Sequence, residues 1–271
     1  MKRKRGERME RELKTLKEAM LAAGTEALRL AKTGFETRTK SDQSPVTTAD
    51  LAVNEILQSR LGEEFPEDGW LSEESQDNGD RLSKQRVWIV DPIDGTRAYV
   101  RGDPEFCISV ALVEDGRPIL SAIYNPTRGE WFSAIHRGGL MVEHLSKPDA
   151  GRFEPGERPI VLVNPWDLRS GRLRQLESRV RCQPIGSIAY GLALVAAGQA
   201  EAAIMLDGGN EWDIVAGILL VIEGGGQATN ASGELPCFNQ PNTRQRGALA
   251  LSSSIHPPLL NLLKKTAAAG R

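Results

Sequence analysis

Two aspartates, Asp91 and Asp94, directly follow the apolar residues 87–90 and are separated by a proline and Ile93. Proline cannot donate a hydrogen bond to a sheet, so Asp-Pro after four apolar residues marks the end of a core strand. Carboxylates at such a rigid strand tip can converge on a hard cation, and the Ile93 carbonyl can add a neutral oxygen ligand. The pattern predicts a site for a divalent metal ion.

Gly95 and Thr96 come next, and their backbone N–H groups can bind an anion beside the metal. A phosphate held next to a divalent ion is the arrangement that phosphoryl chemistry requires. Taken alone, the sequence Asp-Pro-Ile-Asp-Gly fits an acidic turn after a core strand about equally well. The other acidic segments decide between these two interpretations.

Three further segments contain acids, and each has a structural explanation of its own. Residues 71–75 (Leu-Ser-Glu-Glu-Ser) precede another core strand, where a solvated acidic turn is the simpler explanation. Residues 47–50 (Thr-Thr-Ala-Asp) imitate a capping box that suits a helix dipole, a role that does not exclude chemistry. Residues 211–213 (Glu-Trp-Asp) precede a helix whose free N–H groups Asp213 can bond as an N-cap. Only the combination of these segments is specific.

In this order, the four acidic segments resemble the motifs of the inositol monophosphatase family, over about residues 40–226. The resemblance implies an α/β protein with the layered α/β/α/β/α sandwich of the sugar-phosphatase type. It also implies Mg²⁺-dependent hydrolysis of a small phosphate monoester by metal-activated water. Inhibition by lithium and a homodimer are further properties that the family implies.

The metal ligands follow from the resemblance, residue by residue. Glu73, Asp91 and the Ile93 carbonyl match the ligands of one Mg²⁺ ion. Asp91, Asp94 and Asp213 match the ligands of the second ion. Glu73 also lies next to a third, weaker site in this scheme. The resemblance therefore implies two or three Mg²⁺ ions and a catalytic role for Glu73.

The remaining functional residues also match family positions. Thr96 with Asp50 matches the pair that orients or deprotonates the attacking water. The N–H groups of Gly95 and Thr96 match the phosphate-binding site. Three residues match the segments that contact the rest of the substrate: Gly186, Ser187 and Glu211.

The resemblance leaves two substrates open. Glu211 stands only two residues before Asp213, which departs from dedicated inositol monophosphatases. Residues 40–50 look more like bacterial 3'(2'),5'-bisphosphate nucleotidases of the CysQ type, whereas residues 123–126 (Ile-Tyr-Asn-Pro) look more like inositol monophosphatases. Adenosine 3',5'-bisphosphate is therefore the favoured substrate and inositol monophosphate the alternative. A catalytically silent regulator that binds metal or phosphate is the third hypothesis.

The hydrophobic pattern predicts the elements that position these residues. Apolar residues at three- and four-residue steps predict a long helix over residues 10–34 and a second helix that begins at Thr47 or Thr48. Hairpin and turn signals predict an antiparallel meander after the Asp91 strand. Its strands are expected at residues 106–113, 119–124 and 130–135.

Strands alternate with helices in the second half of the chain. We expect an N-terminal half, residues 1–150, and a C-terminal half, residues 151–271, packed as one compact unit with a seam at residues 146–158. The expected strands are residues 160–163, 202–205 and 248–251. The expected helices are residues 168–180, 188–197, 214–223 and 257–265.

Composition excludes several classes of protein. The 271 residues include 34 Lys and Arg against 36 Asp and Glu, a balance that attracts neither a nucleic acid polymer nor a membrane surface. Three widely spaced cysteines predict a reducing compartment, the cytoplasm. The three histidines fall outside every acidic motif, which argues against zinc chemistry. The expected partner is a small phosphorylated substrate.

Overall fold

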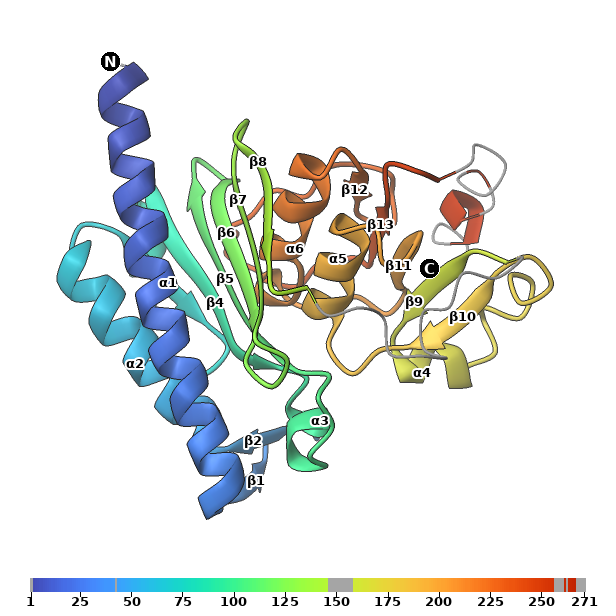
Figure 1. Cartoon of the computed structure of the whole chain (residues 1–271), viewed down its shortest axis with the longest axis horizontal. Helices are drawn as coiled ribbons and strands as arrows, with labels where there is room; N and C mark the ends of the chain where they lie inside the picture. Colours follow the sequence, from blue (N-terminus) through green and yellow to red (C-terminus); the bar gives the residue numbers. More distant parts are fainter. Residues whose placement is uncertain (1, 42, 146–157, 256–260, 262, 267–271) are drawn as a thin grey trace.

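The computed structural model describes residues 2–41, 43–145, 158–255, 261 and 263–266. Helices and sheets stack in alternating layers, which confirms the α/β/α/β/α sandwich (Figure 1). Helices α1 and α2 cover one face of a six-stranded sheet, and α5 and α6 lie between that sheet and a five-stranded sheet. The helices are α1 (Lys2–Thr33), α2 (Thr48–Glu64), the 3₁₀ helix η1 (Asp80–Ser83), α3 (Thr96–Val100), α4 (Pro165–Arg169), α5 (Ile188–Ala196) and α6 (Glu211–Glu223).

The six-stranded sheet has the order β3-β4-β5-β6-β7-β8. Strand β3 pairs with β4 in parallel, and all other neighbours are antiparallel, so the predicted meander is present and extends by one further strand, β8. The strands are β3 (Gly69–Ser72), β4 (Arg86–Asp94), β5 (Cys107–Glu114), β6 (Arg117–Asn125), β7 (Glu130–Ile135) and β8 (Gly139–Glu143).

Strand β4 is buried along its whole length because helices cover both of its faces. Trp88 and Val90 pack into the core beneath α1 and α2. Val87 and Ile89 pack into the core that contains α5 and α6. Burial on both faces explains why this strand is continuously apolar in sequence. It also holds the acidic end of the strand in a fixed position.

The five-stranded sheet has the order β10-β9-β11-β13-β12. Strands β10, β9 and β11 are parallel, and β13 and β12 are antiparallel to their neighbours. A separate two-stranded ribbon joins β1 (Thr37–Thr39) to β2 (Pro45–Thr47). The strands of the larger sheet are β9 (Ile160–Val163), β10 (Arg181–Pro184), β11 (Ala202–Met205), β12 (Gln227–Thr229) and β13 (Ala248–Leu251).

The predicted helix over residues 168–180 is wrong. Helix α4 ends at Arg169, and turns follow from a glycine in the left-handed region, Gly171 with φ +75°. Leu173 and Leu176 are nevertheless fully buried against the five-stranded sheet. Their spacing of three imitates helical periodicity because successive turns also bring every third residue to the same face.

Two predictions fall largely on residues that the structure does not describe. The seam at residues 146–158 overlaps residues 146–157, and the terminal helix at residues 257–265 overlaps residues 256–260 and 262, which all lie outside the described residues. The division into two halves therefore stays a prediction. None of the described helices has the combination of length and apolar character that crossing a membrane requires.

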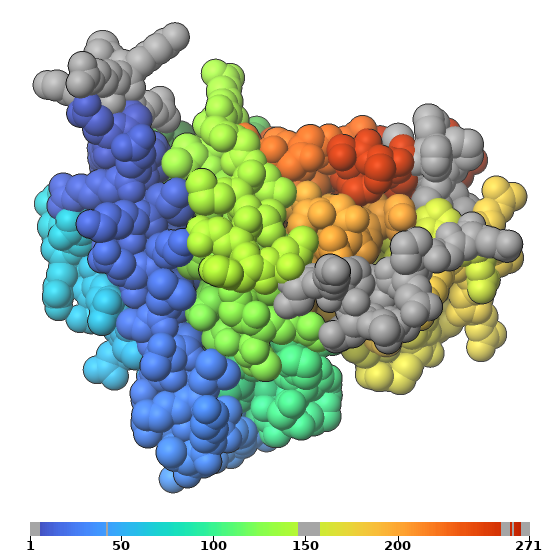
Figure 2. Space-filling view, in the orientation of Figure 1, coloured from blue at the N-terminus to red at the C-terminus, as the bar shows by residue number. Residues whose placement is uncertain are grey.

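Figure 2 shows how the edge of the six-stranded sheet is flanked. Strand β8, in yellow-green, lies between α1, in blue, and the orange surface of the second half. Lys17 of α1 pairs with Glu143 of β8 at 2.6 Å, and β8 also contacts α6. The helical layers on the two faces of this sheet are therefore both tied to its last strand.

Candidate active site

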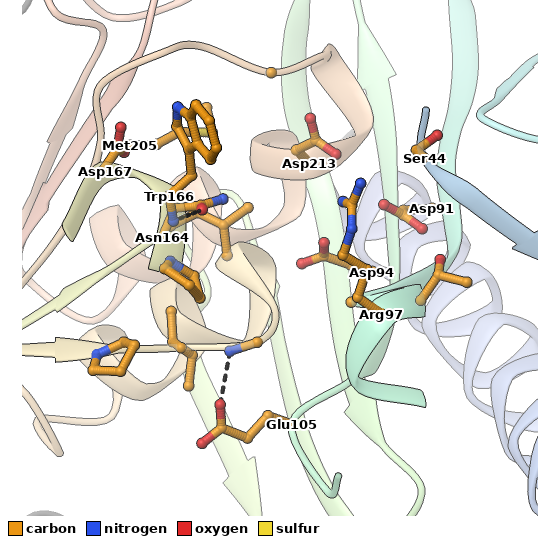
Figure 3. A pocket seen from close by; sticks show the side chains of 18 of the residues that line it. Ser44, Asp91, Asp94, Arg97, Glu105, Asn164, Trp166, Asp167, Met205 and Asp213 are labelled. Carbon is orange, nitrogen blue, oxygen red and sulfur yellow. Dashed lines mark hydrogen bonds between the residues drawn. The ribbon is translucent and has the colours of Figure 1, made fainter. Parts of the chain in front are cut away.

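Three aspartates from distant parts of the chain meet in one cavity. Asp91 and Asp94 extend from the end of β4, and Asp213 extends from the first turn of α6 (Figure 3). One carboxylate oxygen from each residue lies within 4.8 Å of the others. The cavity around them has a volume of about 1150 Å³. The structure thus brings together three of the predicted metal ligands.

The electrostatics of this cluster suit a bound cation. Burial and the neighbouring carboxylates, Glu73 first among them, raise the pKa of Asp91 well above its ordinary value. Burial raises the pKa of Asp94 to about 6 and that of Asp213 to about 8. Within the described part of the chain, Asp91 Oδ1 is buried without a hydrogen-bond partner. Because close, buried like charges are unfavourable, a divalent ion fits the needs of this donor set.

Hydrogen bonds from two helix N-termini orient the carboxylates. Asp94 Oδ2 accepts hydrogen bonds from Ser187 Oγ at 2.5 Å and from the backbone N–H of Ala189 at 2.6 Å, both at the start of α5. Asp213 Oδ2 accepts from the backbone N–H of Asn210 at 2.6 Å. The prediction that Asp213 is the N-cap of α6 is wrong. Asn210 is the N-cap, and Asp213 bonds back to its N–H from the third helical position.

Glu73 lines the same cavity but lies outside the group of three aspartates. Its Oε1 accepts a hydrogen bond from Lys40 Nζ at 2.7 Å, and the same ammonium lies 2.5 Å from Glu74 Oε1. Burial lowers the pKa of Lys40, but the two carboxylates outweigh it, so the net shift is upwards. A positive charge therefore lies beside Glu73.

Asp50 and Thr96 lie in direct contact. Thr96 Oγ1 is 3.1 Å from Asp50 Oδ1 and 3.1 Å from the Ile93 carbonyl oxygen, so its single proton has two acceptors. Asp50 Oδ2 accepts hydrogen bonds from the N–H of Thr47 at 2.8 Å and from its hydroxyl at 2.6 Å. Asp50 thus completes the predicted capping box of α2 and also faces Thr96.

The glycines of the predicted substrate site lie at close backbone approaches. Gly95 has φ +94°, and a Cβ there would lie 2.9 Å from the carbonyl oxygen of Glu105. Gly95, Thr96 and Gly186 all line the cavity. The N–H of Gly186, however, donates to Glu105 Oε2 at 2.7 Å. Gly186 therefore shapes the wall of the cavity while its N–H is engaged elsewhere.

The match to a protein family decides how this geometry is classified. The model of the inositol monophosphatase family matches residues 8–267, nearly the whole chain. The chain belongs to the inositol monophosphatase family. Members of this family are phosphatases, so the acidic cluster lies in a phosphatase scaffold.

Relatives that are named for different activities match this chain to a similar degree. Inositol monophosphatase 2 of Solanum lycopersicum is 31% identical over 202 residues, covering 69% of this chain and 75% of that protein. The 3'(2'),5'-bisphosphate nucleotidase CysQ of Escherichia coli K12 is 31% identical over 181 residues, covering 66% and 73%. The crystal structure of the extragenic suppressor protein suhB from Bartonella henselae has a TM-score of 0.79 and 27% identity, covering 96% and 99%. Similarity alone does not select the substrate.

Two residues predicted to contact the substrate do not line the cavity of this family member. Ser187 is fully buried, and its hydroxyl donates to Asp94 and accepts from the N–H of Tyr190 at 3.0 Å. Glu211 is also fully buried, and its carboxylate accepts from the N–H groups of Asn239 at 2.6 Å and Gln240 at 2.8 Å. In the structure, Ser187 orients a cluster aspartate and Glu211 anchors a loop to α6, and their contact with a substrate stays a prediction.

Several cavity residues were not predicted from the sequence. Trp166 lies on the side of the cavity opposite Asp91 and Asp94 in Figure 3. Four arginines from three separate segments also line the cavity: Arg97, Arg101, Arg169 and Arg244. Arg97 and Arg101 belong to α3 and its C-cap, and the other two lie far from them in the sequence.

Proposed function

We propose that the chain is a Mg²⁺-dependent phosphomonoesterase, a phosphoric monoester hydrolase. The observation that carries this proposal is the cluster of three carboxylates within 4.8 Å, in a large cavity and with a buried, unpartnered oxygen on Asp91 among the described residues. Oxygen-only ligands are what magnesium prefers, and the described cluster contains neither histidine nor cysteine.

The residues available for the ions are those of the cluster and its neighbours. Asp91, Asp94 and Asp213 would hold one ion, and Asp91 with Glu73 and the Ile93 carbonyl would hold another. A third, weaker ion would lie next to Glu73. When bound, divalent ions in such a site neutralise phosphate charge and lower the pKa of water. Glu73 would exchange its contact with Lys40 for a contact with the ion.

Thr96 and Asp50 are suited to handle the proton of the attacking water. The threonine hydroxyl donates to Asp50, so its lone pairs can accept a hydrogen bond from a water molecule in the cavity. Burial raises the pKa of Asp50, which favours the transfer of a proton to this carboxylate. Gly95 and Thr96, which directly follow Asp94, would hold the phosphate through their backbone.

We propose adenosine 3',5'-bisphosphate as the substrate because arginines line the cavity away from the three clustered aspartates. Four arginines line it, and a bisphosphate offers them a second phosphate after the first has reached the acidic cluster. Inositol monophosphate is the second candidate. It is favoured by a relative of 31% identity that carries the name inositol monophosphatase.

A panel of esters tests the proposal. Release of phosphate is measured from adenosine 3',5'-bisphosphate, inositol 1-phosphate and fructose 1,6-bisphosphate, with Mg²⁺ and with EDTA. We expect Mg²⁺-dependent release, fastest from adenosine 3',5'-bisphosphate. Faster release from inositol 1-phosphate would select the second candidate. No release from any ester would favour a catalytically silent regulator that keeps the fold.

The proposal extends to the surroundings of the enzyme. The three cysteines, Cys107, Cys182 and Cys237, are free, as expected for a reducing compartment such as the cytoplasm. We also propose a homodimer and inhibition by lithium, in line with the family. Sedimentation of the purified protein tests the assembly, and lithium added to the ester panel tests the inhibition.

A further inference from the structure

Trp166 is a large apolar side chain that points into a polar cavity. It is 63% exposed, more than any other large hydrophobic residue in the described part of the chain. Its backbone is fixed, because it follows Pro165 at the start of α4 and its N–H donates to Asn164 Oδ1 at 2.8 Å. An exposed indole on a fixed backbone at the wall of a binding cavity is typical of a ligand-contacting side chain.

Arg169 completes this surface. Its guanidinium lies 5.9 Å from the centre of the Trp166 ring, one helical turn further along α4. The guanidinium lies over one face of the indole in a cation–π contact, and an aromatic base can stack on the opposite face. In Figure 3, Trp166 rises from Asn164 and faces the acidic cluster across the cavity.

The charges around Trp166 favour an anionic ligand. Asp167 and Asp207 line the same wall, but Arg172 pairs with both, at 2.8 Å and 2.5 Å. Within the described residues, Arg169 forms no ion pair, whereas Arg244 interacts with Asp213 of the acidic cluster and partly offsets the rise in its pKa that burial causes. This wall therefore presents an aromatic ring next to an unpaired guanidinium, which matches the base and phosphate of a nucleotide.

We propose that Trp166, with Arg169 over its ring, stacks against the nucleobase of the leaving group and makes nucleotides the preferred substrate class. This inference rests on the proposed phosphomonoesterase function and assigns its specificity to one wall of the cavity. Inositol has no π-face, so it gains nothing comparable from the indole. Trp166 is a specificity-determining residue in this account and takes no part in the chemical step.

The kinetic test compares two substrates in three variants. Trp166→Ala should lower the ratio of kcat/KM for adenosine 3',5'-bisphosphate over inositol 1-phosphate by roughly 5- to 150-fold, mainly through KM for the nucleotide. Trp166→Phe, which keeps an aromatic face, should restore most of this ratio. Met141→Ala, at a side chain on β8 that is 52% exposed, is the matched control and should leave the ratio unchanged. An unchanged ratio in Trp166→Ala would overturn the inference.

A binding measurement separates this inference from the proposed function. Calorimetry with adenosine 3',5'-bisphosphate and Mg²⁺ is done in the Asp50→Asn background, where turnover is slow, with and without Trp166→Ala. Loss of affinity on removal of the indole supports stacking even if the wild-type chain hydrolyses no ester. Equal affinities overturn stacking even if the wild-type chain is an active phosphatase. A change of sedimentation with equal affinities would assign Trp166 to a contact between copies instead.

Discussion

The two walls of the cavity are built on opposite principles. On one wall, Asp91 and Asp94 are buried, and N–H or hydroxyl groups fix Asp94. On the other wall, Trp166 is largely exposed, and Arg169 lies over its ring. The first wall holds carboxylates close together despite their mutual repulsion, an arrangement typical of a site that binds a metal ion for chemistry on a charged ester. The second wall is open and adaptable, as a surface that selects a leaving group needs to be.

The largest expected effect comes from removing one charge from the acidic wall. Asp213→Asn or Asp94→Asn should lower turnover by at least about 1000-fold, because each removes a ligand charge from the metal site. The fold should persist, since asparagine is nearly isosteric and the cluster loses a repulsion. Phosphate release and thermal unfolding, measured side by side, check this. Turnover within tenfold of the wild type would show that the acidic wall does not carry the chemical step.

Asp50→Asn should have the next largest effect. Asparagine retains an oxygen for the Thr47 N–H, so the cap of α2 survives, but it cannot take up a proton. We expect turnover to fall about 100- to 10,000-fold with little change in Tm. If Tm fell as sharply as turnover, Asp50 would be a capping residue alone.

Gly209→Ala probes the packing behind the acidic wall. A Cβ at Gly209 would lie 2.2 Å from Asp213 Oδ2, so the carboxylate must move. Turnover should fall roughly 10- to 100-fold, and more Mg²⁺ should be needed for half-maximal rate. Gly62→Ala on α2 is the control, because a Cβ there meets nothing within 4 Å. Normal kinetics in Gly209→Ala would show that the position of Asp213 is not critical.

The smallest effect concerns stability without metal. Burial raises the pKa of Asp94 to about 6 and of Asp213 to about 8, from 3.8. Between about pH 4 and 8 the folded protein therefore binds more protons than the unfolded chain, so the free energy of unfolding decreases as pH rises. In EDTA, Tm should fall by several degrees from pH 5 to pH 8, and Mg²⁺ should reverse the fall. A Tm in EDTA that rises over this range would contradict the clustering of the acids.

The predictions from the sequence agree best with the structure where functional residues are close together in the sequence. The acidic tip of β4 was predictable because two aspartates closely follow four apolar residues. The strand does not end at Asp91-Pro92, however, but continues to Asp94 with a register shift after Asp91, since a bulge tolerates a proline. The Thr47–Asp50 capping box was predictable because its four residues are contiguous. The helix at residues 168–180 failed because turns and helices share the spacing of their buried residues.

The contacts that the sequence could not predict are tertiary. Ser187 contacts Asp94 across 93 positions of sequence, and Glu211 contacts Asn239 across 28. The residues that flank Ser187 and Glu211 in the sequence do not indicate whether these side chains form buried contacts within the protein or contacts with a substrate. Trp166 reaches the cavity only because α4 follows the end of β9, and a tryptophan in a sequence predicts core more often than a binding surface.

The direct test of the central claim is anomalous diffraction from crystals of the wild-type protein soaked in Mn²⁺, a divalent ion with the same oxygen preference as Mg²⁺. The account predicts a peak among the carboxylates of Asp91, Asp94 and Asp213, and its absence from crystals of Asp213→Asn. Peaks only at other surfaces, with none among the three aspartates of the wild-type protein, would contradict it.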